Sequence, residues 1–432
     1  MSLAPQSVAY RESGIPWLGK IPKHWSIVRG VFLFFNKKVL NSELQCQERL
    51  ALTMSGVIER DIEKNDGLNP ADFRTYQIFQ QDDLVFKLID LDNLKTSRVG
   101  YVHKIGIMSS AYIRLIPRQG VFSKYFYYQY FDLYLKHIFN FLGTGVRSTL
   151  GCDELLDIKI MFPPLQEQKA IADFLDKKTQ QIEDFITKKQ KLITLLEEKK
   201  QTLINQCVTQ GLDSSTSLKD SGVEWLGKIP THWEVRKLKY LIKENLSYGA
   251  NETAELTERT YPRYIRITDF DQNGMLKDET FKSLPPEIAE NFLLSEGDIL
   301  FARSGATVGK TFQFKDYQGL ACYAGYLIKA SLNFRIASSD FVFYYTKSYS
   351  YLQWRDIILN KATIENIGAD KYNELKIPLP PLEEQKAIAE YLDTQIAKID
   401  LAISKIKSQI NLIKEYKSTL ISEAVCGRVG ID

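Results

Sequence analysis

The chain has 432 residues, of which 44% are apolar and 25% charged, and its 56 Lys and Arg residues nearly balance 53 Asp and Glu residues to leave a net charge of +3. This length predicts more than one domain, and the balance of charge excludes a protein that would bind polyanions through its global charge alone. No run of about 18 apolar residues occurs, the beginning lacks an apolar secretory segment, and the five cysteines are far apart. We therefore expect no membrane span and no zinc site, and we predict a cytoplasmic location.

Two short sequences occur twice and frame two halves of the chain. GIPWLGKIPKHW, from Gly14, returns as GVEWLGKIPTHW from Gly222 with nine of twelve residues identical. PPLQEQKAIADFLD, from Pro163, returns as PPLEEQKAIAEYLD from Pro380 with eleven of fourteen identical. Such a repeat predicts two tandem units, roughly 1–213 and 214–432. Gene duplication without functional meaning is the alternative, but the residues between the framing motifs have diverged, which favours one frame around two different modules.

The N-terminal repeat segment, residues 1–25, ends in WLGKIPKHW, and its counterpart ends in WLGKIPTHW. His24 and His232 occupy equivalent positions in these motifs. Neither has a Cys or His ligand partner nearby in the sequence. We therefore predict packing or hydrogen-bonding roles for them at the base of each module, and not metal ligation.

The first module, residues 26–162, is predicted to mix short strands with helices. A strand begins within DDLVFKLIDLDN, and an aromatic helix begins at Ser123, a suitable N-cap; we expect its rings to form core, with a base-stacking surface as the alternative. Residues 84–147 hold nine Lys or Arg and three Asp, a local charge of +6 that suits a phosphate backbone, although a solvated face is the alternative. The predicted DNA-binding residues lie in basic or Gly-rich loops: Lys87, Asn93, Lys95, Arg98, Thr144, Arg147 and Ser148.

A long helix is predicted over residues 163–210. The Pro-Pro pair at its start forbids helix before it and allows helix after it. A three-four apolar spacing then predicts a coiled-coil seam, and about 40 residues at about 1.5 Å each give a rod of roughly 60 Å. The seam positions predicted in this helix are Ile171, Leu175, Lys178, Ile182, Phe185, Lys189, Leu192, Leu196, Lys199 and Leu203.

A Ser-rich linker and repeat segment, residues 211–233, leads into the second module, residues 234–379. This module has a strand within GDILFARSGATVGK and an aromatic helix beginning at Ser339. Residues 299–361 hold eight Lys or Arg and three Asp, so the basic half recurs at the same place with a charge of +5. The predicted DNA-binding residues here are Tyr248, Asn251, Arg303, Ser304, Lys310, Lys361 and Thr363.

The second long helix is predicted over residues 380–427. Its seam is predicted at Ile388, Leu392, Gln395, Ile399, Ala402, Ile406, Gln409, Ile413, Tyr416 and Leu420. The simplest partner for each apolar stripe is the other helix, and connection through a module favours an antiparallel pair. Two separate helices, each folded onto its own module, are the alternative.

Two motifs resemble parts of enzyme active sites, but each lacks a feature that the chemistry requires. GATVGKT, from Gly305, has three residues between its glycine and Gly-Lys, whereas a phosphate-binding loop needs four. Asp157 and Glu374 lie in register ahead of the Pro-Pro pairs and could belong to a nuclease metal site, but such a site needs another acid on a neighbouring strand. We expect no catalytic residues and no metal site, with a divalent-metal nuclease kept as an alternative.

The doubled PPLxEQKAIAxxLD and WLGKIPxHW motifs around two divergent modules resemble the specificity subunit of a type I restriction-modification system. The resemblance covers nearly the whole chain. It implies an α+β fold of two tandem α/β target recognition domains separated by two long helices in an antiparallel intramolecular coiled coil, with a pseudo-two-fold repeat. It implies a non-catalytic subunit that reads a bipartite, asymmetric double-stranded DNA target with a fixed spacer.

The resemblance also implies partners. Two methyltransferase subunits and the restriction or translocase subunits would dock on this chain, which itself would hold no cofactor. S-adenosylmethionine, ATP and Mg²⁺ would belong to those partners, and a flipped adenine would be methylated there. A scaffold that binds only proteins through its coiled coil is the remaining alternative.

Overall fold

The computed structural model describes residues 9–54, 56–61, 72–92, 97–143, 148–271, 274, 276–360 and 366–431. The chain divides into two compact units. Unit 1 comprises residues 1–189 and 407–432, and unit 2 comprises residues 190–406. Each unit therefore contains one module together with a part of both long helices, because each long helix passes from one unit into the other.

Unit 1 begins with a short hairpin and contains two four-stranded sheets. Its strands are β1 (Tyr10–Glu12), β2 (Lys20–Pro22), β3 (Ser26–Arg29), β4 (Phe34–Phe35), β5 (Arg49–Thr53), β6 (Gly56–Arg60), β7 (Gln77–Phe79), β8 (Leu84–Phe86), β9 (Val99–Tyr101), β10 (Gly106–Met108), β11 (Ile113–Pro117) and β12 (Lys159–Phe162). Its shorter helices are η1 (Gly30–Phe32), η2 (Phe73–Thr75), α1 (Ser123–Leu135), α2 (Ile138–Leu142) and α3 (Cys152–Asp157).

Unit 2 repeats most of these elements. Its strands are β13 (Leu218–Asp220), β14 (Lys228–Pro230), β15 (Glu234–Lys237), β16 (Ser247–Tyr248), β17 (Arg263–Ile265), β18 (Ile299–Ala302), β19 (Thr311–Gln313), β20 (Ala321–Tyr323), β21 (Leu327–Ala330) and β22 (Lys376–Leu379). Its shorter helices are η3 (Leu238–Tyr240), η4 (Ile267–Asp269), η5 (Asp278–Thr280), α5 (Pro286–Ala289), η6 (Glu290–Phe292), η7 (Gly305–Thr307), α6 (Ser339–Tyr345), α7 (Tyr349–Asn360) and α8 (Ala369–Asn373).

One four-stranded sheet has the same strand order in both units, whereas the second sheet has four strands in unit 1 (β6-β5-β10-β7) and two strands in unit 2 (β17-β20). The strand order β4-β11-β8-β9 in unit 1 corresponds to β16-β21-β18-β19 in unit 2. The parallel pair of β5 with β10 corresponds to the parallel pair of β17 with β20. The antiparallel pair of β3 with β12 corresponds to that of β15 with β22, so the strand after each HW motif pairs with the strand before each Pro-Pro. The tandem repeat predicted from the framing motifs is confirmed.

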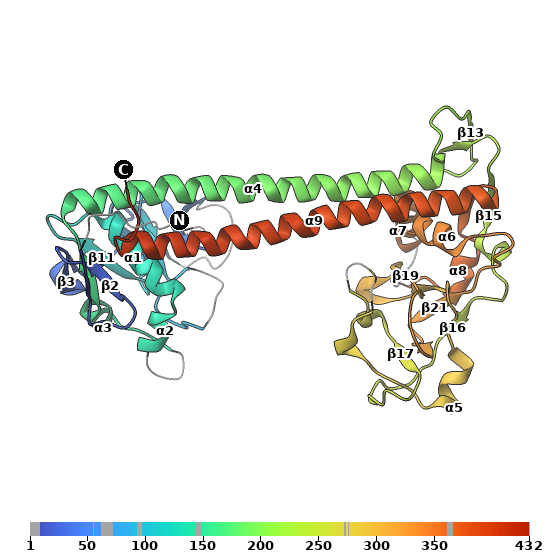
Figure 1. Ribbon diagram of the computed structural model, residues 1–432, viewed down its shortest axis with the longest axis horizontal. Coiled ribbons are helices and arrows are strands. Elements are labelled where there is room, and N and C mark those ends of the chain that lie inside the picture. The colour runs from blue at the N-terminus through green and yellow to red at the C-terminus, as the bar shows by residue number, and fades with distance from the viewer. Residues whose placement is uncertain are drawn as a thin grey trace. The chain divides into compact units, whose positions relative to one another are not determined.

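The two long helices pair within each unit. Helix α4 (Leu165–Gln210) has 46 residues and α9 (Leu382–Val425) has 44. In unit 1 the beginning of α4 lies beside the end of α9, and in unit 2 the end of α4 lies beside the beginning of α9 (Figure 1). Ion pairs cross the helix pair in both units, with 2.6 Å between Lys417 and Glu183 and 2.8 Å between Lys200 and Asp400. The antiparallel pairing is confirmed.

The seam differs from the predicted one by a single residue over parts of both helices. Phe185 is 39% exposed, while its neighbour Ile186 is buried, and Gln409 is exposed where Ile410 is buried. Ala402 likewise lies at the edge beside buried Ile403. A straight helix repeats every 3.6 residues, so a stripe that follows a 3.5-residue pattern drifts around it, and the adjacent apolar residue takes the buried position.

A buried glutamine explains part of the repeated helix motif. Gln385 is fully buried, and its Nε2 donates to the carbonyls of Pro380 at 2.9 Å and Ile336 at 3.1 Å. Its Oε1 accepts from the backbone N–H of Ser338 at 2.8 Å, which fixes the start of α6. Gln168 makes equivalent bonds with the Pro163 carbonyl and the Phe122 N–H in unit 1. The amide therefore anchors each aromatic helix to the beginning of a long helix.

We expect Gln385→Ala to lower the free energy of unfolding of unit 2 by about 2–4 kcal/mol, because it leaves buried backbone groups without partners. Lys386→Ala, at an exposed neighbouring position, should change it by about 0.5 kcal/mol or less. Urea unfolding followed by tryptophan fluorescence measures both variants. Equal midpoints for the two variants would remove the anchoring role.

Candidate DNA interface

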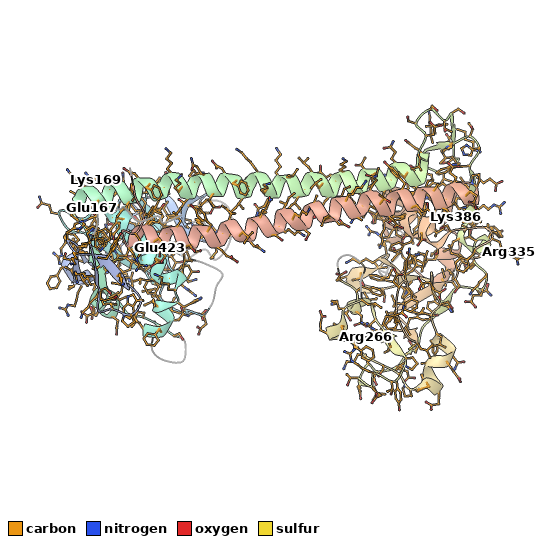
Figure 2. The ribbon with its side chains drawn as sticks, in the orientation of Figure 1. Glu167, Lys169, Arg266, Arg335, Lys386 and Glu423 are labelled. Carbon is orange, nitrogen blue, oxygen red and sulfur yellow. The ribbon has the colours of Figure 1, made fainter. Side chains whose placement is uncertain are left out.

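One carboxylate in the first turn of each long helix connects that helix to the preceding HW motif. Glu167, labelled in Figure 2, accepts from Trp25 Nε1 at 2.8 Å and lies 2.8 Å from His24 Nε2. Glu384 makes the same contacts with Trp233 at 3.1 Å and His232 at 2.8 Å. The predicted hydrogen-bonding role of both histidines is confirmed.

The acids considered for a nuclease site are occupied by ion pairs. Asp157 lies 3.0 Å from Arg29, and Glu374 lies 2.5 Å from Lys237 and 2.7 Å from Lys239. Hydrogen bonds from Lys237 and then Lys239 lower the pKa of Glu374 to about 2. Among the described residues no group of three His, Cys, Asp or Glu side chains could hold a metal ion. These contacts tie the strand before each Pro-Pro to the strand after each HW motif.

A backbone hydrogen bond brings two predicted DNA-binding loops together in unit 1. The Leu150 N–H donates to the Leu88 carbonyl at 2.9 Å, which joins the segment after α2 to the loop after β8. Asp92 strengthens this junction, because its carboxylate accepts from Asn140 Nδ2 at 3.1 Å and from Ser148 Oγ at 3.2 Å. We call this contact the first loop junction.

The predicted residues of unit 1 have different placements around this junction. Lys87 is half-buried, and Ser148 lies within the junction at a left-handed φ of 41°. Arg98 is 1% exposed, and its guanidinium donates to the carbonyls of Ile89 at 3.3 Å and Asp90 at 2.5 Å. The burial of Arg98 argues against direct contact with DNA, because its guanidinium donates its hydrogen bonds to carbonyls of the loop. The predicted residues Asn93, Lys95, Thr144 and Arg147 lie outside the described residues.

The equivalent junction occurs in unit 2. The Ile367 N–H donates to the Arg303 carbonyl at 2.8 Å, and Ser304 forms a β-bridge with Asn366. The Arg303 guanidinium lies 4.7 Å from the ring centre of Tyr248, whose hydroxyl accepts from the Ala369 N–H at 3.0 Å. The structure thus brings the predicted residues Arg303 and Ser304 together with the predicted residue Tyr248 from another segment, and we call this surface the second loop junction.

The other predicted residues of unit 2 flank this junction. Asn251 is exposed and lies against Gly325, where a Cβ would come within 1.9 Å of its Oδ1. Lys310 is exposed at the far end of the Gly305 loop, which returns into strand β19. A phosphate-binding loop would lead into a helix N-terminus, so this loop has the wrong continuation as well as the wrong spacing. Lys361 and Thr363 lie outside the described residues.

The sequence analysis missed Asn366. Its Oδ1 and the Nε of Arg303 are buried without a hydrogen-bond partner in the described part of the chain. Buried polar atoms of this kind usually have partners, so both atoms favour a ligand at this surface. The spacing of the two Pro-Pro motifs was the available signal, since the same spacing aligns Leu150 with Ile367 and puts Asn366 next to a residue of the junction.

A lysine after helix α6 has an unusual pKa. Burial, followed by repulsion from Lys310 and Lys200, lowers the pKa of Lys347 to about 8. Its Nζ donates to the Thr311 carbonyl at 2.6 Å and lies 4.5 Å from the ring centre of Phe343. Lys347 lies between the module and the end of α4, and it loses its positive charge around pH 8 and not near the usual 10.5.

This lysine predicts a pH dependence of stability. Since the folded pKa lies below the unfolded value of 10.5, the unfolded state binds more protons between pH 8 and 10.5, and stability from this group rises with pH there. We expect unit 2 to gain about 1–2 kcal/mol between pH 7.5 and 9.5, and Lys347→Met to lack this gain. Denaturant unfolding of both proteins at the two pH values measures the difference, and parallel curves would contradict it.

Comparisons with known proteins agree with this arrangement. The family model described as type I restriction modification DNA specificity domain matches residues 30–195 and again residues 230–412. The type I restriction enzyme EcoKI specificity subunit of Escherichia coli is 26% identical over 211 residues, which are 47% of this chain and 44% of that protein. The MjaVIII specificity subunit of Methanocaldococcus jannaschii is 26% identical over 354 residues, 77% of this chain and 76% of that protein.

Solved structures share the fold. A chain from the structure of a type I R-M system, solved for its complex assembly and conformational transition, has a TM-score of 0.71 at 15% identity, with 94% of this chain and 98% of that chain covered. The HsdS subunit from Thermoanaerobacter tengcongensis has a TM-score of 0.54 at 16% identity, with 97% and 100% covered. The match to the E. coli relative spans less than half of that protein's length. With most of its residues matched by the family model in two copies, the chain belongs to the type I restriction modification DNA specificity family.

Proposed function

We propose that this chain is the non-catalytic, DNA-reading subunit of a type I restriction-modification complex. The observation that carries the proposal is the loop junction, which recurs in both units through equivalent backbone bonds of 2.9 and 2.8 Å. Each junction joins loops from the basic half of its module, as phosphate contacts and base contacts both require. The names of the relatives, all specificity subunits, support the same role.

The two junctions carry different side chains, so the two DNA half-sites differ. Lys87 and Ser148 flank the first junction, whereas Arg303, Tyr248 and Asn366 form the second. Side chains of different chemistry select different base edges in the major groove. The target is therefore asymmetric, with two short specified parts around an unspecified gap. The long helices set the length of the unspecified DNA between the two half-sites. The predicted modules, residues 26–162 and 234–379, are the parts that can be exchanged between family members.

The outer faces of the long helices provide surface for protein partners. Large apolar side chains remain exposed there, namely Phe185, Leu412 and Tyr416 in unit 1 and Leu195 and Leu401 in unit 2. Two methyltransferase subunits dock on these repeated faces, and restriction subunits join them. S-adenosylmethionine, ATP and Mg²⁺ belong to those partners. None of the described helices is long and apolar enough to cross a bilayer, and a cytoplasmic location fits access to DNA.

We expect genomic DNA from cells that express this chain with its methyltransferase to carry methyladenine in a split motif with a fixed gap. Exchange of residues 26–162 for a module from another family member should change one half of the motif and leave the other half and the gap unchanged. Methylation-sensitive sequencing reads the motif directly. A continuous motif, or a change in both halves, would overturn the proposal.

Arg303 tests the electrostatic part of the proposal. We expect Arg303→Ala to reduce the slope of log binding constant against log salt by about 1, because one phosphate contact is lost. Arg335→Ala, which alters an exposed arginine before α6, serves as the matched control and should leave the slope unchanged. Anisotropy titrations of a duplex at several salt concentrations measure both slopes, and equal slopes would exclude Arg303 from the interface.

A further inference from the structure

The two most exposed aromatic rings among the described residues each lie beside one loop junction. Phe141 is 80% exposed and Tyr326 is 67% exposed. Phe141 lies at the end of a helix in unit 1, and Tyr326 lies in a turn in unit 2. Because these elements are not equivalent in the repeat, the repeat does not explain why an exposed ring lies beside each junction. A ring held in water loses the stabilisation that burial provides, which is about 1.5–3 kcal/mol for a side chain of this size.

Phe141 is presented by a helix that is fixed on its other side. Phe139, two residues earlier in α2, is fully buried and lies 6.4 Å from Phe86 between ring centres. Asn140 ties the same turn to the first loop junction through Asp92 at 3.1 Å and the Leu91 carbonyl at 3.2 Å. Because residues two apart on a helix point to different sides, anchoring Phe139 directs Phe141 into solvent beside the junction.

Tyr326 is presented by a tight turn. The Leu327 N–H donates to the Ala324 carbonyl at 2.8 Å, and the Gly325 N–H donates to the Ala250 carbonyl at 2.7 Å. The Tyr326 carbonyl accepts from the Arg303 N–H at 3.0 Å, which attaches the turn to the second loop junction. The turn that carries the ring is therefore bonded directly to the residue whose guanidinium lies over Tyr248.

We propose that Phe141 and Tyr326 are the residues that stack on, or wedge between, the bases of the two DNA half-sites. This inference rests on the proposed function. Aromatic and apolar side chains that enter a groove partly unstack a base step, and cations beside them hold the backbone. Each unit pairs such a ring with a polar loop junction, so each half-site receives one uncharged contact that salt does not screen.

The experiment compares these two rings with two others of similar exposure. Phe141→Ala and Tyr326→Ala are the test variants. Phe32→Ala and Tyr240→Ala are the matched controls, since these rings are 63% and 61% exposed and occupy equivalent positions at the module bases. Binding of the full chain to its target duplex, defined by methylation mapping, is measured at several salt concentrations, alongside duplexes with either half-site scrambled.

Each test variant should bind the target roughly tenfold more weakly, with an unchanged salt slope, since base stacking is uncharged. The loss from Phe141→Ala should vanish on the duplex whose first half-site is scrambled, and the loss from Tyr326→Ala on the other duplex. The controls should bind as the unaltered chain does. The fluorescence of 2-aminopurine placed in each half-site should change on binding, because its stacking changes, and the change should be smaller with the matching variant.

The outcomes separate the inference from the proposed function. If the unaltered chain does not prefer its target duplex over the scrambled ones, the proposed function fails. If it does prefer the target but the test variants bind as tightly as the controls, the wedge inference fails alone. A loss that is equal on all duplexes would assign these rings to folding and would equally overturn it.

Discussion

The contact on which each unit depends is the one between the opening HW motif and the first turn of a long helix. The carboxylates of Glu167 and Glu384 accept from buried tryptophans, and a carboxylate at this position also complements the positive helix N-terminus. Loss of either acid would leave a buried indole N–H without an acceptor. The same bonds recur in both units, so the base of each module is set independently of what the module reads.

The loop junctions follow a different rule, because their shared bonds involve only the main chain. A hydrogen bond from Leu150 to the Leu88 carbonyl, or from Ile367 to the Arg303 carbonyl, places no demand on the side chains beside it. The loops therefore hold one geometry while their side chains differ. The main-chain groups of these residues hold the loops in place, and their side chains are left for the proposed recognition of DNA. The side chains can therefore change without altering the fold of the loops.

The sequence predicted the frame well but did not indicate which loops meet, for physical reasons. Near-identical motifs identified the repeat, the long helices and the hydrogen-bonding role of His24 and His232. The seam was misplaced at Phe185 because Ile186 is also apolar, and periodicity alone does not choose between adjacent apolar residues. Arg98 resembled a phosphate contact, but loop carbonyls needed its donors. The junction partners lie about sixty residues apart, and no local pattern joins them.

The junctions also limit the entropy that binding costs. Each loop leaves a strand whose residues are fully buried, β8 in unit 1 and β18 in unit 2, and is fixed again by the backbone bond at the junction. On the proposed function, the side chains at each junction still lose rotamer freedom when they bind DNA, at about 0.5–1.5 kcal/mol for each long side chain. On the proposed function, a few contacts per half-site then discriminate between bases, because the main chain at each junction is already held by its own hydrogen bonds.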